Sequence, residues 1–283
     1  MNSPAPYVGR FAPTPNGPMH AGTAAAALLA RAHARAAGGR FLLRWDDLDP
    51  LRCRAEWIDS LRADLLWLGV DWDAEVHQSR RRAAYEPRLL ALAGRGLVYP
   101  CRCSRADVRR RTDRAYDGRC RADAFRDADP AAALLADPGR SAAERPALRL
   151  LRPDGDGSSD PVIWSREGHP AYTFASALDE NDLGVTHVVR GEDLAGEAGP
   201  QSAVLSLLGR PVPEFVHFPL VRDPAGGKLS KSAGAPPLRE RWSGDAAAFR
   251  DWVGRAFFDP PVGGADLPAG WRSSRLRAPE AGR

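Results

Sequence analysis

The sequence predicts an α/β fold built around a parallel sheet, and three consecutive segments near its start support this prediction. Residues 7–13 (YVGRFAP) alternate like a strand, residues 21–39 are rich in helix formers and end in two glycines, and residues 40–50 (RFLLRWDDLDP) form a second apolar run. A strand, a helix and a strand in this order make a βαβ unit with parallel strands. The 283 residues suffice for one substantial core and a smaller attached module.

Further elements follow along the chain. Residues 52–68 and 80–97 carry apolar side chains at helical spacing, and a turn is expected at Gly168. The Val-rich residues 185–190 predict a strand with which the sheet resumes. Residues 259–283 are rich in Pro, Gly and Arg with little to bury, so we expect a disordered tail.

Composition narrows the class of protein. The sequence contains no run of about 18 apolar residues and no charged segment followed by an apolar one at its start, so neither a membrane span nor secretion is expected. We expect a soluble, cytoplasmic monomer that does not bind membranes. The net charge of +4 is a mild indication of an anionic partner.

Residues 13–23 (PTPNGPMHAGT) connect the first strand to the first helix. A tight Pro/Gly turn and a helix that begins near Gly22 would direct backbone N–H groups and the positive end of a helix dipole at the edge of the sheet. His20 adds a donor at the same place. An anion such as a nucleotide phosphate fits this position, although an ordinary βα turn has the same composition.

Lysine is used very selectively. Of 40 Lys and Arg residues only Lys228 and Lys231 are lysines, and both lie in the sequence KLSKS. A compact ammonium on a flexible stem suits a mobile phosphate clamp better than a guanidinium fork does. Chance remains an alternative for a sample of two.

Three of the four cysteines lie close together in the sequence. Cys101, Cys103 and Cys120 predict a metal site with an unassigned fourth ligand, because four cysteines are too few for a disulfide scaffold of this size. Reduced, buried cysteines are the alternative, and the surrounding arginines disfavour it. Cys53 has no such neighbours and is expected to be a plain helix residue.

The same region is strongly basic. Residues 105–126 contain eight arginines and four aspartates. Such an excess suits a phosphate backbone, and a solvated charged surface is the alternative.

The sequences HAGT and KLSKS, the first on the opening βα turn and the second after the late apolar run FVHFPLV, resemble the two signature motifs of class I aminoacyl-tRNA synthetases. GRFAPTPNGPMHAGT, LLRWDDLDPLR, YTFASALD and GVTHVVRGEDL are similar to the glutamyl-tRNA synthetase group within this family. The resemblance extends from about residue 7 to about residue 257.

The resemblance implies a Rossmann-type class I catalytic core with a zinc-containing insertion and a small helical C-terminal part. The implied organisation is the first half of the core in residues 1–100, the insertion and a connector in 101–150, the second half of the core with the KLSKS loop in 151–235, helices in 236–258 and the tail in 259–283.

The resemblance also implies a reaction, the activation of glutamate by ATP, with magnesium, to glutamyl-adenylate. Such a reaction needs positioning and charge stabilisation rather than a protein nucleophile. The implied site consists of His20, Lys228 and Lys231 for catalysis, Arg10, Phe11, Ala12, Pro13, Thr14, Asp46, Tyr172 and Arg190 for glutamate, and His20, Gly22, Thr23 and Lys231 for ATP.

The family's metal ligands map onto the cysteine-rich region. The resemblance implies one structural zinc per chain, bound by Cys101, Cys103, Tyr116 and Cys120. A metal that staples a short insertion contributes to its folding.

Two departures from the family pattern bear on the site. RWDDLDP stands where the family has RIEDLDP, so that Asp46, one methylene shorter than glutamate, would face the substrate ammonium. AGEAGPQ, residues 195–201, replaces the usual run before the next helix.

The resemblance is to truncated members of the group, which lack the large C-terminal domain that reads the anticodon. It implies that the acceptor is the queuosine base in the anticodon of tRNA(Asp). Two alternatives remain from the sequence: an authentic glutamyl-tRNA synthetase that acts on the tRNA 3′ end, and a catalytically silent, zinc-stapled RNA-binding paralogue.

Overall fold

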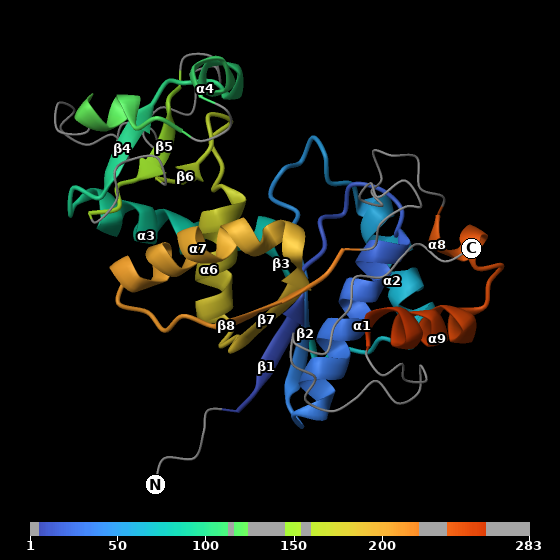
Figure 1. Cartoon of the computed structure of the whole chain (residues 1–283). Helices are drawn as coiled ribbons and strands as arrows, with labels where there is room; N and C mark the ends of the chain where they lie inside the picture. The colour runs from blue at the N-terminus through green and yellow to red at the C-terminus, as the bar shows by residue number, and fades with distance from the viewer. Residues whose placement is uncertain (1–5, 113–115, 124–144, 154–159, 221–236, 259–283) are drawn as a thin grey trace, which may run out of the picture. The chain divides into compact units, whose positions relative to one another are not determined.

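The structure forms two compact units. A computed structural model describes residues 6–112, 116–123, 145–153, 160–220 and 237–258 (Figure 1). The first unit comprises residues 1–78, 184–195 and 213–283, and the second comprises 79–183 and 196–212. Within the described ranges, none of the helices has the length and apolar character needed to cross a membrane.

Parallel strands form the centre of the first unit and confirm the predicted α/β class. β1 (Val8–Phe11), β2 (Arg40–Trp45) and β3 (Ala74–His77) form a parallel sheet in the order β1-β2-β3, with Arg10 opposite Leu42. α1 (Ala21–Ala36) connects β1 to β2, as the βαβ pattern predicts. β7 (His187–Gly191) and β8 (Glu214–Phe218) form a second parallel pair.

Thr186 joins these two groups of strands. Its backbone N–H donates to the Val8 carbonyl at 2.9 Å, and its Oγ1 accepts from the Val8 N–H at 2.9 Å. Three residues further along, the Val189 carbonyl accepts from Nη1 of Arg10 at 3.1 Å. β1 and β7 therefore lie side by side and run in the same direction, so that the strand order is β3-β2-β1-β7-β8.

Helices surround this sheet and bury the first unit's core. They are α2 (Ala55–Trp67), α8 (Leu238–Arg241), α9 (Ala246–Phe257) and the short 3-10 helix Glu192–Leu194, in addition to α1. The buried face of α1 is mostly alanine, which lets its backbone approach the strands closely. α9 contributes Phe249, Val253 and Phe257 to the same core.

The second unit contains an antiparallel sheet. β4 (Val98–Cys101), β5 (Ala147–Leu150) and β6 (Val162–Trp164) pair in that order. The α-helices of this unit are α3 (Arg82–Ala93), α4 (Arg105–Arg111), α6 (Tyr172–Asp182) and most of α7 (Ala195–Leu207). The 3-10 helix Arg119–Asp123 also belongs to it, and a further 3-10 helix, Gln78–Arg81, precedes α3. The turn predicted at Gly168 is confirmed, since this residue has a positive φ of 85°.

A buried carboxylate anchors α6 to α3. Asp179 is fully buried and accepts hydrogen bonds from Nε of Arg81 at 2.6 Å and from the Tyr85 hydroxyl at 3.0 Å. A buried charge is tolerated only with such partners. The pairing fixes the position of the helix that begins at Tyr172.

A cluster of titratable groups lies at the opposite edge of the first unit's sheet, where β1, β7 and β8 begin. The Tyr7 ring stacks on His187 with centroids 4.1 Å apart, and its hydroxyl lies 2.6 Å from Nδ1 of His33. Burial raises the pKa of Tyr7, so the hydroxyl keeps its proton and shares a hydrogen bond with Nδ1 of His33. Nε2 of His187 lies 3.4 Å from Glu214.

This cluster predicts a loss of stability in acid. Burial, followed by the electrostatic interaction with His187, lowers the pKa of His33 below its ordinary 6.5, whereas Glu214 opposes the shift. The unfolded chain therefore binds a proton at a higher pH than the folded chain, and the stability present above pH 6.5 is lost as the pH falls through the folded pKa. The thermal midpoint should fall between pH 7.5 and pH 5.5 by more in the wild type than in His33→Gln. Equal falls would contradict this role of His33.

Candidate active site and metal centre

The carboxyl edge of the first unit's sheet gathers three of the predicted site residues. Arg10 lies in β1, Arg190 lies in β7, and Asp46 directly follows β2; all three are at least 94% buried. They converge because the carboxyl ends of parallel strands meet at one edge, where open α/β sheets bind their ligands. Two guanidinium groups and one carboxylate match an amino acid that carries two carboxylates and one ammonium.

Arg44 holds Asp46, and sequence reasoning missed it. The side chains are 0% and 4% exposed, and Nε of Arg44 lies 2.7 Å from Oδ1 of Asp46. Residues two apart on a strand point to the same face, so the R-x-D pattern at the end of β2 was the available signal. This ion pair fixes the side chain of Asp46, which is one methylene shorter than the family's glutamate, at the carboxyl edge of the sheet.

His217 is the second residue that sequence reasoning missed. It lies opposite Arg190 in the β7–β8 register, and its Nε2 accepts from Nε of Arg190 at 3.2 Å. Burial, then Arg190 and Arg10, lowers the pKa of His217, so that the ring is neutral and can accept. The guanidinium also lies over the Phe215 ring, with Cζ 4.9 Å from the centroid. Only the pairing of two distant strands reveals this support.

The predicted nucleotide turn lies at the same edge. The Pro13 carbonyl accepts from the Asp46 N–H at 3.1 Å, which ties the loop after β1 to the end of β2. His20 is the N-cap of α1: its Nδ1 accepts from the Thr23 N–H at 3.4 Å, and its Nε2 lies 2.9 Å from Thr23 Oγ1. In this conformation the ring is turned toward the first turn of the helix.

The remaining predicted residues fall into three places. Phe11, Ala12 and Thr14 lie at the end of β1 and in the following loop, and Gly22 and Thr23 lie in the first turn of α1. Tyr172 begins α6 in the second unit.

Lys228 and Lys231 lie outside the described residues, but the residues that flank their segment are described. On one side the Leu220 N–H donates to Glu192, which follows β7, at 3.3 Å. On the other side the Leu238 N–H donates to the Met19 carbonyl, next to His20, at 3.0 Å. Leu220 and Leu238, two described residues that flank this part of the sequence, are therefore tied to the carboxyl edge.

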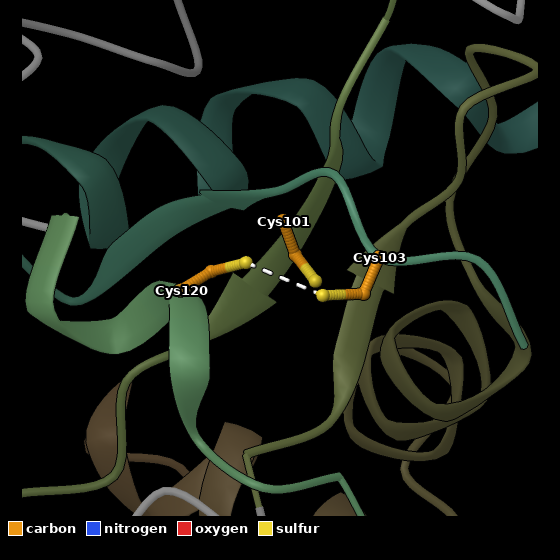
Figure 2. Close-up of side chains that lie close together, drawn as sticks. All are labelled: Cys101, Cys103 and Cys120. Atoms are coloured by element: carbon orange, nitrogen blue, oxygen red, sulfur yellow. Dashed lines mark hydrogen bonds between the residues drawn. The ribbon is translucent and has the colours of Figure 1, made fainter. Parts of the chain in front are cut away.

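Three cysteines of the second unit point toward one another (Figure 2). The sulfur atoms of Cys101, Cys103 and Cys120 all lie within 4.8 Å of one another, and those of Cys103 and Cys120 are 3.5 Å apart. Sulfur ligands of a tetrahedral zinc lie roughly 3.8 Å apart, given bonds of about 2.3 Å. The three cysteines can hold a metal ion such as zinc.

Cys53 does not belong to this cluster. It precedes α2 in the first unit, where burial and the nearby carboxylate of Asp47 raise the pKa of its thiol to about 11. A thiol with such a pKa is a poor metal ligand. The sequence placed Cys53 in a helix, and the structure places it just before α2.

Tyr116 lies next to the cysteine cluster. Its hydroxyl accepts from the Cys120 N–H at 2.8 Å, and it shares a buried apolar cluster with Tyr99 and Cys101. Burial, then the charge of Cys101, raises the pKa of Tyr116. A metal ion that displaces the phenolic proton would relieve this unfavourable environment.

Part of the basic segment is described. The four arginines of α4 are all exposed, and the side chains of Arg110 and Arg111 pair with Asp107 and Asp117. Ser104 caps the helix through a capping box with Asp107. Arg114 and Arg126 lie outside the described residues.

Comparison with known proteins identifies the family. The model of the family described as tRNA synthetases class I (E and Q), catalytic domain, matches residues 7–149 and 152–246. The chain belongs to this class I tRNA synthetase family. The resemblance inferred from HAGT and KLSKS is thereby confirmed.

Curated members of this synthetase family align over most of the chain. A glutamyl-Q tRNA(Asp) synthetase of Parasynechococcus marenigrum (strain WH8102) is 42% identical over 240 residues, which cover 83% of this chain and 78% of that protein. A protein of the same description from Deinococcus radiodurans is 40% identical over 249 residues, 82% of each chain.

A solved structure supports the class I synthetase fold. The crystal structure of a glutamate tRNA ligase from Elizabethkingia meningosepticum, in complex with its amino acid, aligns with a TM-score of 0.78 and 23% sequence identity. The alignment covers 97% of this chain and 66% of that longer chain.

Proposed function

We propose that the chain activates L-glutamate with ATP and transfers it to the queuosine base in the anticodon of tRNA(Asp), as a cytoplasmic monomer. The observation that carries this proposal is the identity of about 40% to glutamyl-Q tRNA(Asp) synthetases over most of both chains. The grouping of Arg10, Arg190 and Asp46 at the carboxyl edge is consistent with a glutamate pocket.

The reaction proceeds in two balanced steps. A carboxylate oxygen of glutamate attacks the α-phosphorus of ATP, forming glutamyl-adenylate and releasing pyrophosphate. A hydroxyl of the acceptor then attacks the activated carbonyl carbon and loses its proton, and AMP leaves. Neither step needs a protein nucleophile, so the protein positions the reactants and stabilises developing charge.

In this proposal the buried arginines select the substrate. Arg10 and Arg190 bind its carboxylates, and their guanidinium groups are held by the Val189 carbonyl and by His217. Asp46, fixed by Arg44, faces the ammonium. The family resemblance assigns Tyr172, at the start of α6, as a further glutamate-binding residue. Phe11, Ala12, Pro13 and Thr14 supply the backbone wall of the pocket. Side chains held in this way lose little entropy when the substrate binds.

The ATP phosphates occupy the start of α1 in this proposal, with magnesium as their counterion. Backbone N–H groups at Gly22 and Thr23 and the helix dipole favour an anion there. His20 contacts the phosphates after its ring turns from Thr23. Lys228 and Lys231 clamp the departing pyrophosphate, which is consistent with the hydrogen bonds that tie the flanking residues Leu220 and Leu238 to the same edge.

The metal centre has a structural role in this proposal. Cys101, Cys103, Tyr116 and Cys120 hold one zinc ion, which would tie the segment around Tyr116 to β4. The exposed Arg105 and Arg109 contact phosphates of the tRNA, so that binding weakens as salt rises.

Zinc content tests the centre. Wild-type protein purified without added zinc should contain one zinc per chain, and Cys101→Ala or Cys120→Ala should lose it and melt at a lower temperature because the insertion loses its cross-link. Cys53→Ala, outside the cluster, should keep the metal. Elemental analysis gives the ratio, and a value near zero in folded, active wild type would refute the site.

Pyrophosphate exchange tests the clamp. The wild type should exchange labelled pyrophosphate into ATP in the presence of glutamate and without tRNA. Lys231→Ala should slow this exchange by about 10² or more, the scale seen when one preorganised charge-stabilising donor is lost. Aspartate in place of glutamate is the matched control and should support little exchange. A rate unchanged in Lys231→Ala would reject the assignment.

The acceptor decides between the proposed function and an authentic glutamyl-tRNA synthetase. Labelled glutamate should enter tRNA(Asp) that contains queuosine and should not enter queuosine-free tRNA(Asp) or tRNA(Glu). An unpaired anticodon loop can present its splayed wobble base, whose vicinal hydroxyls resemble those of a terminal ribose. Incorporation into tRNA(Glu) would favour the authentic synthetase, and no incorporation into any tRNA would favour the silent paralogue.

A further inference from the structure

Arg149 shares one face of the antiparallel sheet with the cysteine cluster. In the β4–β5 register Tyr99 lies opposite Arg149, and Cys101 lies opposite Ala147. Directly opposite residues and residues two apart on a strand point to the same face of a sheet. The Arg149 side chain therefore lies on the face that carries the proposed metal ligands.

The guanidinium of Arg149 stacks on a proposed ligand. Its Cζ lies 3.6 Å from the centroid of the Tyr116 ring, and its Nη1 donates to the Asp160 carbonyl at 2.5 Å. Its buried Nε has no hydrogen-bond partner, and among the described residues no carboxylate lies within 4.0 Å of the guanidinium nitrogens. The carboxylate of Asp160 itself accepts from the Tyr99 hydroxyl and the Arg152 N–H. The positive charge of Arg149 is therefore directed at Tyr116.

A loaded metal centre would need such a charge. A divalent ion with three thiolates and one phenolate carries a net charge of about −2. Cys101 is fully buried and Tyr116 is 5% exposed, so water screens the charge on these two ligands poorly, whereas Cys103 and Cys120 are only partly buried. Arg111 lies 3.3 Å from the Cys103 sulfur, but Asp117 binds the same guanidinium at 2.6 Å and offsets much of its effect.

We propose that Arg149 is an outer-sphere cation of the metal centre, which stacks on the ring of Tyr116 and stabilises the anionic, metal-bound form of the site. The inference rests on the proposed zinc centre. Arg149 is a positioning residue and not a ligand: it orients the phenol ring and compensates its negative charge. Partners outside the ligand set typically change metal affinity by about 10- to 100-fold.

Zinc affinity, measured by competition with a chromophoric chelator, tests this role. Arg149→Gln removes the charge and should weaken zinc binding by about tenfold or more. Arg149→Lys keeps the charge and should retain most of the affinity. Arg82→Gln is the matched control, because Arg82 lies over the Trp164 ring in the same unit, with Cζ 5.8 Å from its centroid, and should leave the affinity unchanged.

A second substitution separates charge compensation from simple packing. Tyr116→Phe keeps the ring under Arg149 but removes the phenolate, so Arg149→Gln should change zinc affinity much less in this background than in the wild type. The metal-free Arg149→Gln protein should melt close to the metal-free wild type. If Arg149→Gln does not fold, Arg149→Met keeps a long side chain over the ring and carries the same expectation.

Three outcomes would overturn the proposal for Arg149. In the first, Arg149→Gln binds zinc as tightly as the wild type. In the second, Arg149→Gln and Arg149→Lys lose the same amount of zinc affinity. In the third, Arg149→Gln lowers zinc affinity as much in the Tyr116→Phe background as in the wild type. A wild type that binds no zinc would instead reject the metal centre itself, so the two failures are distinguishable.

Discussion

The hydrogen bonds between Val8 and Thr186 are the constraint on which the first unit depends. They join residues 178 positions apart and place β7 beside β1 with the same direction. All five strands then present their carboxyl ends at one edge, and Arg10 of β1 donates there to the Val189 carbonyl of β7, next to Arg190, although the two residues are 179 positions apart. Without this tie the β1-β2-β3 sheet and the β7-β8 pair would be separate surfaces, and Arg190 would not share an edge with Arg10 and Asp46.

Each charged side chain at this edge is held in place by a buried or partly buried group. Asp46 is held by Arg44, Arg190 by His217, and Arg10 by a backbone carbonyl. A polar group that is excluded from water would lose a large amount of free energy if it lost its hydrogen-bond partner. A site built in this way does not have to reorganise its dipoles during the reaction, which is the main source of electrostatic stabilisation in enzymes.

Local patterns predicted much of this structure, and non-local pairing accounts for the rest. Patterns within short stretches of sequence predicted the first βαβ unit, the turn at Gly168 and the cluster of three cysteines, and the structure confirms them. The roles of Arg44 and His217 were not predicted because they depend on how the strands align. Arg190, for example, lies opposite His217 only once β7 and β8 are paired. The antiparallel strands of the second unit escaped for a similar reason, since β4 and β5 are separated by more than 40 residues with no hairpin signal between them.

The choice of arginine over lysine follows from these packed positions. Arg10, Arg44 and Arg190 are each less than 6% exposed, and an arginine in such a place brings a planar, weakly hydrated charge with several directed donors, which can bind a carboxylate and stack on a ring at once. Arg149 does the latter on Tyr116. An ammonium would need a fuller hydration shell than these buried sites can supply. The two lysines of the sequence, Lys228 and Lys231, lie outside the described residues, and a flexible point charge there would suit the departing pyrophosphate of the proposed reaction better than a fixed fork.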